Sequence, residues 1–492
     1  MRKKLIFLFF GLFFSVFFFF SQDLGTKWMA FQKMIINDVS QDSSLSTSNF
    51  SLHLKESNSG KVLVNINAQQ SMIPASNLKL LTTITAIDLM GADFRFTTTI
   101  YTDGKLNEAG ILNGNIFIKG GGDPSLGSEK FEDNQFFLRL LKALNSKGIT
   151  KIQGGIIALL PISDMQPIPD TWVWGDIGNY YGAPCYSLNY LDNMIKIAFK
   201  PGSDMTKIST INHTSPVLNG IDLINQVRNG KPQTGDNSVF YTVPFSNTIL
   251  MKGRVGQMTN KEFVVVKGAH PNPAQQLVND LHQYLIKNNI TIVGKDTVVF
   301  SEENRDSLSL ELLYKHSSER LIDIVQKTNS QSINLFAEGI YQAIGRKMKY
   351  GLDNDSIGMG IKRYWKNKGI SVNGMHIVDG SGLSNYNHIT ASQFTALMSY
   401  AQKQTWYSDF EKSIPKAGQS GTLYKFCKGT IAEGKVAAKT GTLSKITCYT
   451  GTINSQNQQL LFSMMINFYD GSSTKVTKWV EKLFCKIVDQ GL

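Results

Sequence analysis

The fold of this 492-residue chain is decided by the segment Pro74-Ala75-Ser76-Asn77-Leu78-Lys79-Leu80-Leu81-Thr82-Thr83. It follows an alternating apolar run at 62–66, typical of a strand, and continues into an apolar stretch that fits a largely buried helix. Ser76 and Lys79 are three residues apart, so in a helix both side chains lie on one face. The segment therefore predicts either a nucleophilic serine with a lysine as its base or a simple helix N-cap.

The spacing Ser-x-x-Lys is weak evidence by itself, because it also occurs at 413–416 and at 472–475. Pro415 disfavours a helical turn in the first of these. The second follows Asp470-Gly471 and is typical of the start of a helix. Ser76 is therefore the best candidate nucleophile.

Two later motifs complete the pattern, Ser332-Ile333-Asn334 and Lys439-Thr440-Gly441. The second lies in an apolar run at 436–443 that is typical of a strand. A lysine at the edge of a strand is most often simply solvated. The order and spread of the three motifs nevertheless favour a joint function, because serine enzymes that use lysine share this set. We therefore expect Ser76 to attack an acyl carbonyl.

Longer stretches carry a resemblance to one known family; they are 74–83, 119–126, 329–338, 379–384, 421–423 and 438–443. On these stretches the chain resembles the D-alanyl-D-alanine carboxypeptidases of the low-molecular-mass class C penicillin-binding proteins, also called the penicillin-binding protein four family. Ser332 follows Ser76 by 256 residues. Class A β-lactamases share the motifs but have a much shorter interval, whereas the resembled family has a large insertion there.

The resemblance implies a fold class and a division into domains. The fold class is α/β (α+β), a β-lactamase/transpeptidase-like domain with an antiparallel sheet flanked by helices and interrupted by a large β-rich insertion. Apolar patterns agree with strands near both ends of the chain and with long helices at 318–328 and 332–344. The expected domains are a catalytic domain at 23–94 and 306–492, an inserted β-rich domain at 95–122 and 187–305, and a nested domain at 123–186.

The resemblance also implies a role for each site residue. The catalytic residues are Ser76 as nucleophile, Lys79 as base, Ser332 as proton relay to the leaving amine, Asn334 as holder of the acyl-side amide, and Lys439. Lys439 and Thr440 would bind the terminal carboxylate, and Gly441 and Thr442 would line the substrate on the same strand. The backbone N–H groups of Ser76 and Thr442 would stabilise the oxyanion.

These roles imply a serine-type D-Ala-D-Ala carboxypeptidase that acts on peptidoglycan stem peptides. β-Lactam antibiotics would acylate the same serine. No metal or organic cofactor is expected, and the seven histidines show no spacing typical of a zinc peptidase. The sequence leaves open whether the enzyme also cleaves cross-bridges as an endopeptidase, and it does not indicate an oligomeric state.

Members of the family can recognise the free end of the stem side chain with an acid and aromatic residues of the insertion. Asp176 and Tyr181 fit that pattern in the aromatic segment 172–186. An arginine that follows Asp-Gly-Ser-Gly-Leu-Ser in the family is replaced here by Asn385. Specificity for the third residue of the stem therefore stays open, and Asp176 is equally well explained as a loop acid.

Two rival functions come from other classes of protein. A β-lactamase would share the acylation residues but would hydrolyse the penicilloyl adduct quickly. A non-catalytic cell-wall-binding scaffold would have no need of the intact set of Ser76, Lys79, Ser332, Asn334 and Lys439.

The N-terminal leader predicts export. Arg2-Lys3-Lys4 is a positive region, and the apolar run Leu5 to Phe20 is short for a membrane span but right for a signal peptide. Residues 1–22 are therefore expected to be a signal peptide, although the junction lacks a small-x-small cleavage site and an uncleaved anchor is the alternative. The body would be periplasmic or at the outer face of the cytoplasmic membrane.

Charge and cysteine content exclude further classes. The formal net charge is +12, but the basic residues are scattered, which argues against nucleic-acid binding. The positive charge is compatible with weak association with a membrane or cell-wall surface. The segment 475–487 fits a basic amphipathic helix, which could also contact a membrane but is more often part of the core. Four cysteines are too few for a disulfide framework, and a pair such as Cys427 and Cys448 is one that could bridge after export.

Overall fold

The computed structural model describes residues 26–132, 135–301, 310–349, 351, 353–455 and 458–489. The expected leader at 1–22 lies outside the described residues, and so does the choice between a signal peptide and an anchor. Within the described ranges, no helix combines the length and the apolar character that crossing a membrane requires.

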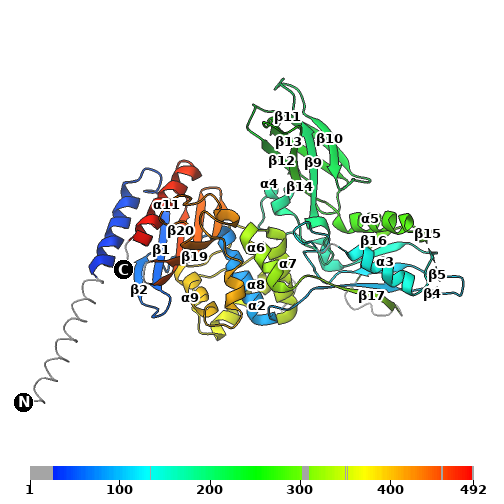
Figure 1. Cartoon of the computed structure of the whole chain (residues 1–492), viewed down its shortest axis with the longest axis horizontal. Helices are drawn as coiled ribbons and strands as arrows, with labels where there is room; N and C mark the ends of the chain where they lie inside the picture. Colours follow the sequence, from blue (N-terminus) through cyan, green and yellow to red (C-terminus); the bar gives the residue numbers. More distant parts are fainter. Residues whose placement is uncertain are drawn as a thin grey trace, which may run out of the picture.

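One antiparallel sheet joins the two ends of the chain (Figure 1), with the strand order β18-β19-β20-β1-β2. Its strands are β1 (Asn49–Glu56), β2 (Val62–Ile66), β18 (Val436–Leu443), β19 (Ile446–Asn454) and β20 (Gln459–Asn467). All eight residues of β1 pair with β20. The segments before and after the large insertion therefore meet in one sheet.

Alternate residues of the strands face two separate cores, as the twofold period of a strand requires. Leu460, Phe462 and Met464 of β20 belong to a core that helix 26–41 and α11 (Ser473–Asp489) cover. Leu461 and Met465 belong to the core on the other face. The helices on that face are α2 (Leu78–Met90), α6 (Leu321–Gln331), α7 (Asn334–Met348), α8 (Asn354–Asn367) and α9 (Ala391–Ala401).

Helix α2 lies inside this helical layer, and each residue from Leu78 to Ile87 is buried. Its apolar residues therefore surround the helix instead of forming one stripe, as expected for a helix that is covered on all sides. The helix begins two residues after Ser76, so the candidate nucleophile is held just before the start of a rigid and buried element.

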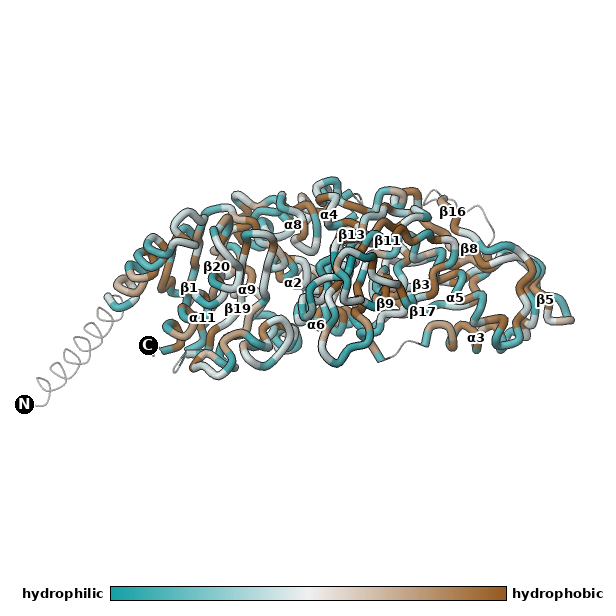
Figure 2. The backbone as a smooth tube through the Cα atoms, turned by 90° about the horizontal axis from the view of Figure 1, so that it is seen from above, coloured by the Kyte–Doolittle hydropathy of each residue, from teal (hydrophilic) through white to brown (hydrophobic). Residues whose placement is uncertain are grey.

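The inserted segment forms a second body with its own core. Its sheets have the orders β16-β8-β6-β3-β17 and β15-β7-β5-β4, in which β4 is Lys105–Leu106 and β15 is Thr291–Ile292. The longer strands are β3 (Thr97–Thr102), β6 (Ile116–Lys119), β8 (Ile156–Pro161), β16 (Thr297–Ser301) and β17 (Glu311–Ser317), and the helices are α3 (Phe136–Ser146) and α5 (Pro273–Lys287). Figure 2 shows this body following the catalytic sheet along the long axis, with brown, apolar stretches around β3 and β8.

A third body projects from the second as an arm made of residues 194–269 (Figure 1). Its two small sheets have the orders β10-β9-β14 and β11-β13-β12 and share one core. The strands are β9 (Met194–Lys200), β10 (Thr210–Ser215), β11 (Asp222–Asn229), β12 (Asp236–Tyr241), β13 (Thr248–Val255) and β14 (Val264–Ala269).

The strand pairing differs from the expected nesting at 123–186. Strands β7 (Lys151–Ile152) and β8 lie in that range, but they pair with β5 (Ile111–Asn113) and β6, which lie before it. We therefore propose that the nested unit is the arm at 194–269. The family resemblance implied a nested domain but did not fix its bounds in this chain, and β10 and β11 of the arm are too exposed to give an apolar pattern.

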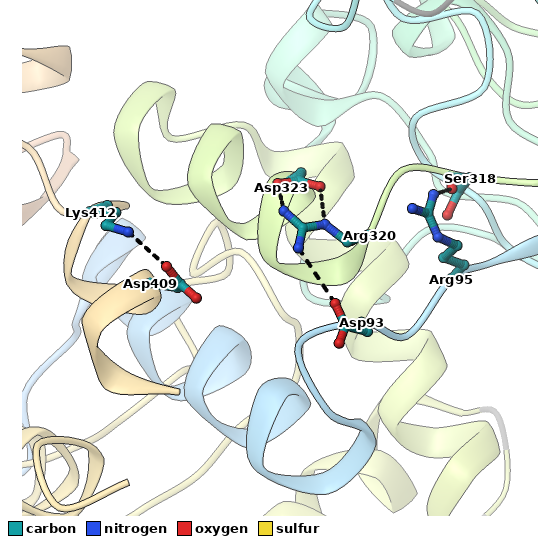
Figure 3. A network of polar contacts seen from close by, with 7 residues as sticks. All are labelled: Asp93, Arg95, Ser318, Arg320, Asp323, Asp409 and Lys412. Atoms are coloured by element: carbon teal, nitrogen blue, oxygen red, sulfur yellow. Dashed lines mark hydrogen bonds and ion pairs between the residues drawn. The ribbon is translucent and has the colours of Figure 1, made fainter. Parts of the chain in front are cut away.

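Two chain crossings connect the catalytic part to the insertion, and they lie side by side. Ser318 N donates to Phe96 O at 2.9 Å, and Leu321 N donates to Phe94 O at 2.7 Å. Figure 3 shows Arg320 of the return crossing between Asp323 and Asp93, with Arg95 donating to the Ser318 carbonyl. The paired crossings restrict how the second body can turn relative to the catalytic sheet.

Candidate active site

Ser76 lies in a short helical turn, η1 (Ala75–Asn77), directly before α2. Asn77 Nδ2 donates to Thr450 Oγ1 of β19 at 2.9 Å and thereby attaches the turn to the sheet. A Cβ on Gly441 would lie 2.5 Å from the Pro74 carbonyl oxygen, so only glycine lets β18 pass this close to the turn. The N-cap of α2 is Asn77, without a side-chain capping bond, so Ser76 is not the cap.

Lys79 is fully buried, and its three donor positions have three partners. Nζ lies 2.9 Å from Ser76 Oγ, 2.6 Å from Asn334 Oδ1 and 2.7 Å from the Ser381 carbonyl oxygen. Burial lowers the pKa of Lys79 to about 7, although the nearby Glu338 and Asp379 act in the opposite direction. A considerable fraction of Lys79 is therefore neutral at neutral pH and carries a lone pair next to the Ser76 hydroxyl.

Ser332 and Asn334 form the second wall, at the junction of α6 and α7. Ser332 is the C-cap of α6 in the left-handed region, with φ of 58°. This turn directs Ser332 Oγ to Lys439 Nζ, at 2.9 Å. Asn334 begins α7 and lies between two parts of the molecule, since Oδ1 accepts from Lys79 and Nδ2 donates to the Tyr181 carbonyl at 2.7 Å.

Lys439 on β18 forms the third wall. Its Nζ also donates to the Thr440 carbonyl at 2.7 Å. Burial, together with the positive charge of Lys79, holds the pKa of Lys439 well below its ordinary value. Because no acid pairs with Lys439 in these contacts, an incoming carboxylate would stabilise its charged form.

A cavity of ≈ 490 Å³ opens onto these residues. Its wall includes Ser76, Ser332, Thr440 and Thr442, together with Thr422 of η5 (Gly421–Leu423). Thr440 Oγ1 donates to Thr422 Oγ1 at 2.9 Å, so two hydroxyls stand together beside the lysine. Its other lining residues are Leu423, Lys425, Phe426, Tyr449, Thr477 and Glu481.

The two expected specificity residues lie close to this cleft on the aromatic segment 172–186, which is the inserted loop. Asp176 is in α4 (Trp174–Ile177) and Tyr181 in η3 (Tyr180–Gly182), and the Tyr181 hydroxyl donates to Asp176 Oδ1 at 3.2 Å. Burial raises the pKa of Asp176, and burial together with Asp176 raises that of Tyr181 to about 12. Asn385 is exposed.

Sequence reasoning missed two buried carboxyl groups behind Lys79. Glu338 of α7 accepts from the backbone N–H groups of Gly380 and Ser381, at 3.0 and 2.8 Å for the shorter contacts. Asp379 is fully buried and accepts from the Trp172 indole at 3.0 Å. Both acids fall in the stretches that carried the family resemblance, but nothing in a single sequence distinguishes a buried acid from an exposed one.

The cysteines are all free thiols, and the suggested pair is not in contact. Cys448 belongs to the core on the helical face of the main sheet, and Cys427 belongs to the core under α11. The sheet separates them, so a bridge between these two is wrong. Over the ranges that the structure describes, no cluster of three His, Cys, Asp or Glu residues could hold a metal ion.

Comparisons with known proteins identify a matching family and similar structures. The model of the D-Ala-D-Ala carboxypeptidase 3 (S13) family matches residues 32–484. A D-alanyl-D-alanine carboxypeptidase of Actinomadura sp. (strain R39) is 25% identical over 430 residues, which cover 84% of this chain and 76% of that protein.

Two solved structures share the fold. Penicillin binding protein 4 of Haemophilus influenzae superposes with a TM-score of 0.78 at 22% identity, covering 92% of this chain and 99% of the other. The same protein in complex with a novel β-lactam gives a TM-score of 0.73 at 22% identity, covering 92% and 98% of the two chains. This likeness confirms the expected fold class of a sheet flanked by helices.

Proposed function

The chain belongs to the D-Ala-D-Ala carboxypeptidase 3 (S13) family of serine peptidases, and on this premise we propose that its nucleophile is Ser76. The substrate would be a peptidoglycan stem peptide that ends in D-Ala-D-Ala. The observation that carries the proposal is the buried Lys79, whose Nζ lies 2.9 Å from Ser76 Oγ.

Acylation begins with transfer of the Ser76 proton to neutral Lys79 and attack on the penultimate D-alanine carbonyl. The oxyanion that forms is stabilised by the backbone N–H groups of Ser76 and Thr442. The close passage of Gly441 beside the Ser76 turn supports this pair of donors, because it brings the two backbones together.

Departure of D-alanine needs a proton on its nitrogen. The proton that Lys79 took from Ser76 would reach this nitrogen through the Ser332 hydroxyl, so that Lys79 becomes neutral again. Lys439 Nζ, 2.9 Å from Ser332 Oγ at the other side of the cleft, would orient that hydroxyl and keep its own proton. Lys439 and Thr440 would bind the terminal carboxylate of the substrate, and Gly441 would line it on the same strand. Asn334 would give its amide to the acyl-side peptide when the substrate takes the place of the Tyr181 carbonyl.

Water then hydrolyses the acyl-enzyme and releases Ser76. β-Lactams would acylate the same serine and leave slowly, which distinguishes this function from that of a β-lactamase. The measured lifetime of the penicilloyl adduct separates the two. A non-catalytic scaffold would form no adduct at all.

The direct test is labelling with a fluorescent penicillin, followed by mapping of the adduct by peptide mass. We expect the label on Ser76, full loss of labelling in Ser76→Ala, and unchanged labelling in Ser472→Ala, the serine of another Ser-x-x-Lys match. An adduct on Ser413 or Ser472 would contradict the assignment.

The finer substrate preference is tested with purified muropeptides. Monomeric pentapeptides report carboxypeptidase action, and cross-linked dimers report endopeptidase action, with products identified by mass. Export, which we propose from the leader, would bring the enzyme to these substrates in the periplasm or at the outer face of the cytoplasmic membrane. Fractionation and sequencing of the mature N-terminus test it, since cytosolic protein that retains Met1 would contradict export.

A further inference from the structure

The inserted loop reaches the catalytic residues at two points. The Tyr181 carbonyl accepts from Asn334, and the Trp172 indole Nε1 donates to Asp379 Oδ2 at 3.0 Å. Trp172 is 7% exposed and Asp379 is 0% exposed, so water does not compete for the second contact. A hydrogen bond to a buried carboxylate is among the stronger ones in proteins.

Asp379 organises the turn that follows it. Its Oδ1 accepts from Gly382 N at 2.7 Å and from Asn387 Nδ2 at 2.8 Å, and its Oδ2 accepts from Ser384 N at 2.7 Å. The turn packs directly against the residue before the nucleophile, since a Cβ on Gly382 would lie 1.9 Å from the Ala75 carbonyl oxygen. A shift of this turn would therefore be felt at Ser76 and Lys79.

The same turn presents the Ser381 carbonyl to Lys79 Nζ. Glu338 holds it from the other side by accepting from the N–H groups of Gly380 and Ser381. The carbonyl that receives one of the three hydrogen bonds of Lys79 is thus fixed between two buried carboxyl groups, one of which depends on the inserted loop.

We propose that Trp172 is a positioning residue for acylation, because its indole holds Asp379, and Asp379 with Glu338 holds the Ser381 carbonyl against Lys79. The proposal rests on the proposed acylation of Ser76. The insertion would then help to position Lys79, in addition to any contact that it makes with substrate.

The charges around the chain of contacts give the proposal a distinctive signature. Negative charge on Glu338 and Asp379 raises the pKa of Lys79, and the Trp172 N–H favours the charged form of Asp379. Loss of that N–H leaves Asp379 neutral more often and so lowers the pKa of Lys79. Other titratable groups that interact with these residues are Lys439 on β18, Tyr341 on α7 and Cys185 after η3. Cys185 in turn lies near Arg346 of α7 and Asp164.

The test measures the rate constant of acylation by a fluorescent penicillin across pH for wild type and Trp172→Phe. We expect a plateau lower by roughly three- to tenfold, because a hydrogen bond to a charged group is lost but acts on Lys79 only through the turn. We also expect the acid limb of the profile to move to lower pH.

Trp365→Phe is the matched control. Trp365 is also buried, and its Nε1 donates to the neutral hydroxyl of Thr85 at 2.8 Å instead of to an acid. This variant should lose comparable thermal stability but keep the wild-type midpoint of the acid limb. A purely structural role of Trp172 would make the two variants alike.

Glu338→Gln supplies a second measurement should Trp172→Phe fold poorly. Burial and the neighbouring Asp379 raise the pKa of Glu338 to about 8, so only part of the Glu338 population is charged where Lys79 titrates. Glutamine removes that charge with little change of shape, so the acid limb should again move to lower pH, by less than the loss of a fully ionised acid would give. If the wild-type protein reacts with penicillin but both variants keep its pH profile, the inference about Trp172 is wrong and the proposed function stands. If the wild-type protein does not react with penicillin at all, the proposed function is wrong and the inference falls with it.

Discussion

At the scale of the residue, burial gives Lys79 the property that a base needs. An exposed lysine is almost fully protonated at neutral pH. Full burial lowers the pKa of Lys79 to about 7, while its hydrogen bonds to Asn334 and Ser381 keep it beside Ser76. The opposing effect of the two acids keeps the pKa near the working pH, where a general base is most effective.

The first prediction concerns this base. Lys79→Ala should reduce the acylation rate on the order of a hundredfold or more, because the positioned proton acceptor is gone. In wild type, acylation should fall as the pH drops through about 7, since protonation removes the lone pair. Stopped-flow labelling with a fluorescent penicillin measures both effects.

Lys475→Ala is the control, because Lys475 belongs to another Ser-x-x-Lys match but lies exposed on α11 beside Asp42. It should label like wild type. Near-native acylation by Lys79→Ala would mean that another group serves as the base of Ser76.

The second prediction concerns Asp176. Pairing with an amino group of the stem peptide near a partly exposed surface is worth only about 0 to 1 kcal/mol. Asp176→Asn should therefore slow hydrolysis of amine-bearing stem peptides several-fold and leave penicillin acylation nearly unchanged. Asn keeps an acceptor for the Tyr181 hydroxyl, so the loop itself should survive.

Comparison of kcat/KM for an amine-bearing and an apolar stem peptide measures this preference. Asp170→Asn, a change of an acid that accepts from Gln166 in the same segment, is the matched control and should alter neither substrate. Equal losses for stem peptide and penicillin in Asp176→Asn would mean that Asp176 only maintains the loop.

At the scale of the element, the sequence predicted strands and helices with a regular apolar pattern, and it missed turns and exposed strands without one. The apolar alternation at 62–66 and 436–443 located β2 and β18 correctly. The helix expected at 332–344 begins at Asn334, because Ser332 adopts a left-handed turn that no periodicity indicates. The small strands β10 and β11 went unseen, since most of their residues are at least partly exposed and give no apolar pattern.

The candidate site was predictable to the same extent. Three motifs located the walls of the cleft, because each combines a reactive residue with a regular element. The supports behind them were not predictable, since Glu338, Asp379 and Trp172 act through contacts between segments far apart in the chain. Such contacts depend on the tertiary fold and leave no local pattern.

The third prediction tests the close passage of β18 beside the Ser76 turn. Gly441→Ala places a methyl group 2.5 Å from the Pro74 carbonyl oxygen and 2.9 Å from Asn77 N. The strand must move away, which should cost about 1 to 3 kcal/mol of folding free energy. The acylation rate should also fall in the fraction of protein that stays folded, because the two backbone N–H groups that stabilise the oxyanion move apart.

Chemical denaturation and penicillin labelling measure the two effects on the same preparation. Gly175→Ala is the control, since its added methyl group has nothing within 4 Å. Wild-type acylation in Gly441→Ala would show that the turn and the strand do not have to be this close.

At the scale of the whole molecule, the arm at 194–269 is attached by strands that begin and end together. Met194 of β9 pairs with Ala269 of β14, so the two attachment points are adjacent. The arm supports the inserted loop through Ala269 N, which donates to the Gly178 carbonyl at 2.9 Å, and through stacking of Trp174 on Tyr241. The arm contacts the inserted loop, and none of the proposed catalytic residues belongs to the arm.

The last prediction follows from this attachment. A variant in which a short glycine linker joins Met194 to Ala269 and replaces residues 195–268 should fold, because the excised core is separate from the others. The loop would lose the bridge of Asn179 to Gly268 and the stacking of Trp174 on Tyr241. It would keep the hydrogen bond between Ala269 and Gly178 and the contact of Trp172 with Asp379. Penicillin acylation should therefore fall no further than in Trp172→Phe, whereas hydrolysis of stem peptides, which needs the loop surface, should fall more. Trp174→Ala in the full chain, which removes only the stacking on Tyr241, should show a weaker form of the same split. Complete loss of acylation in a folded excision variant would place the arm within the catalytic machinery, and an unchanged ratio of the two activities would separate it from substrate choice.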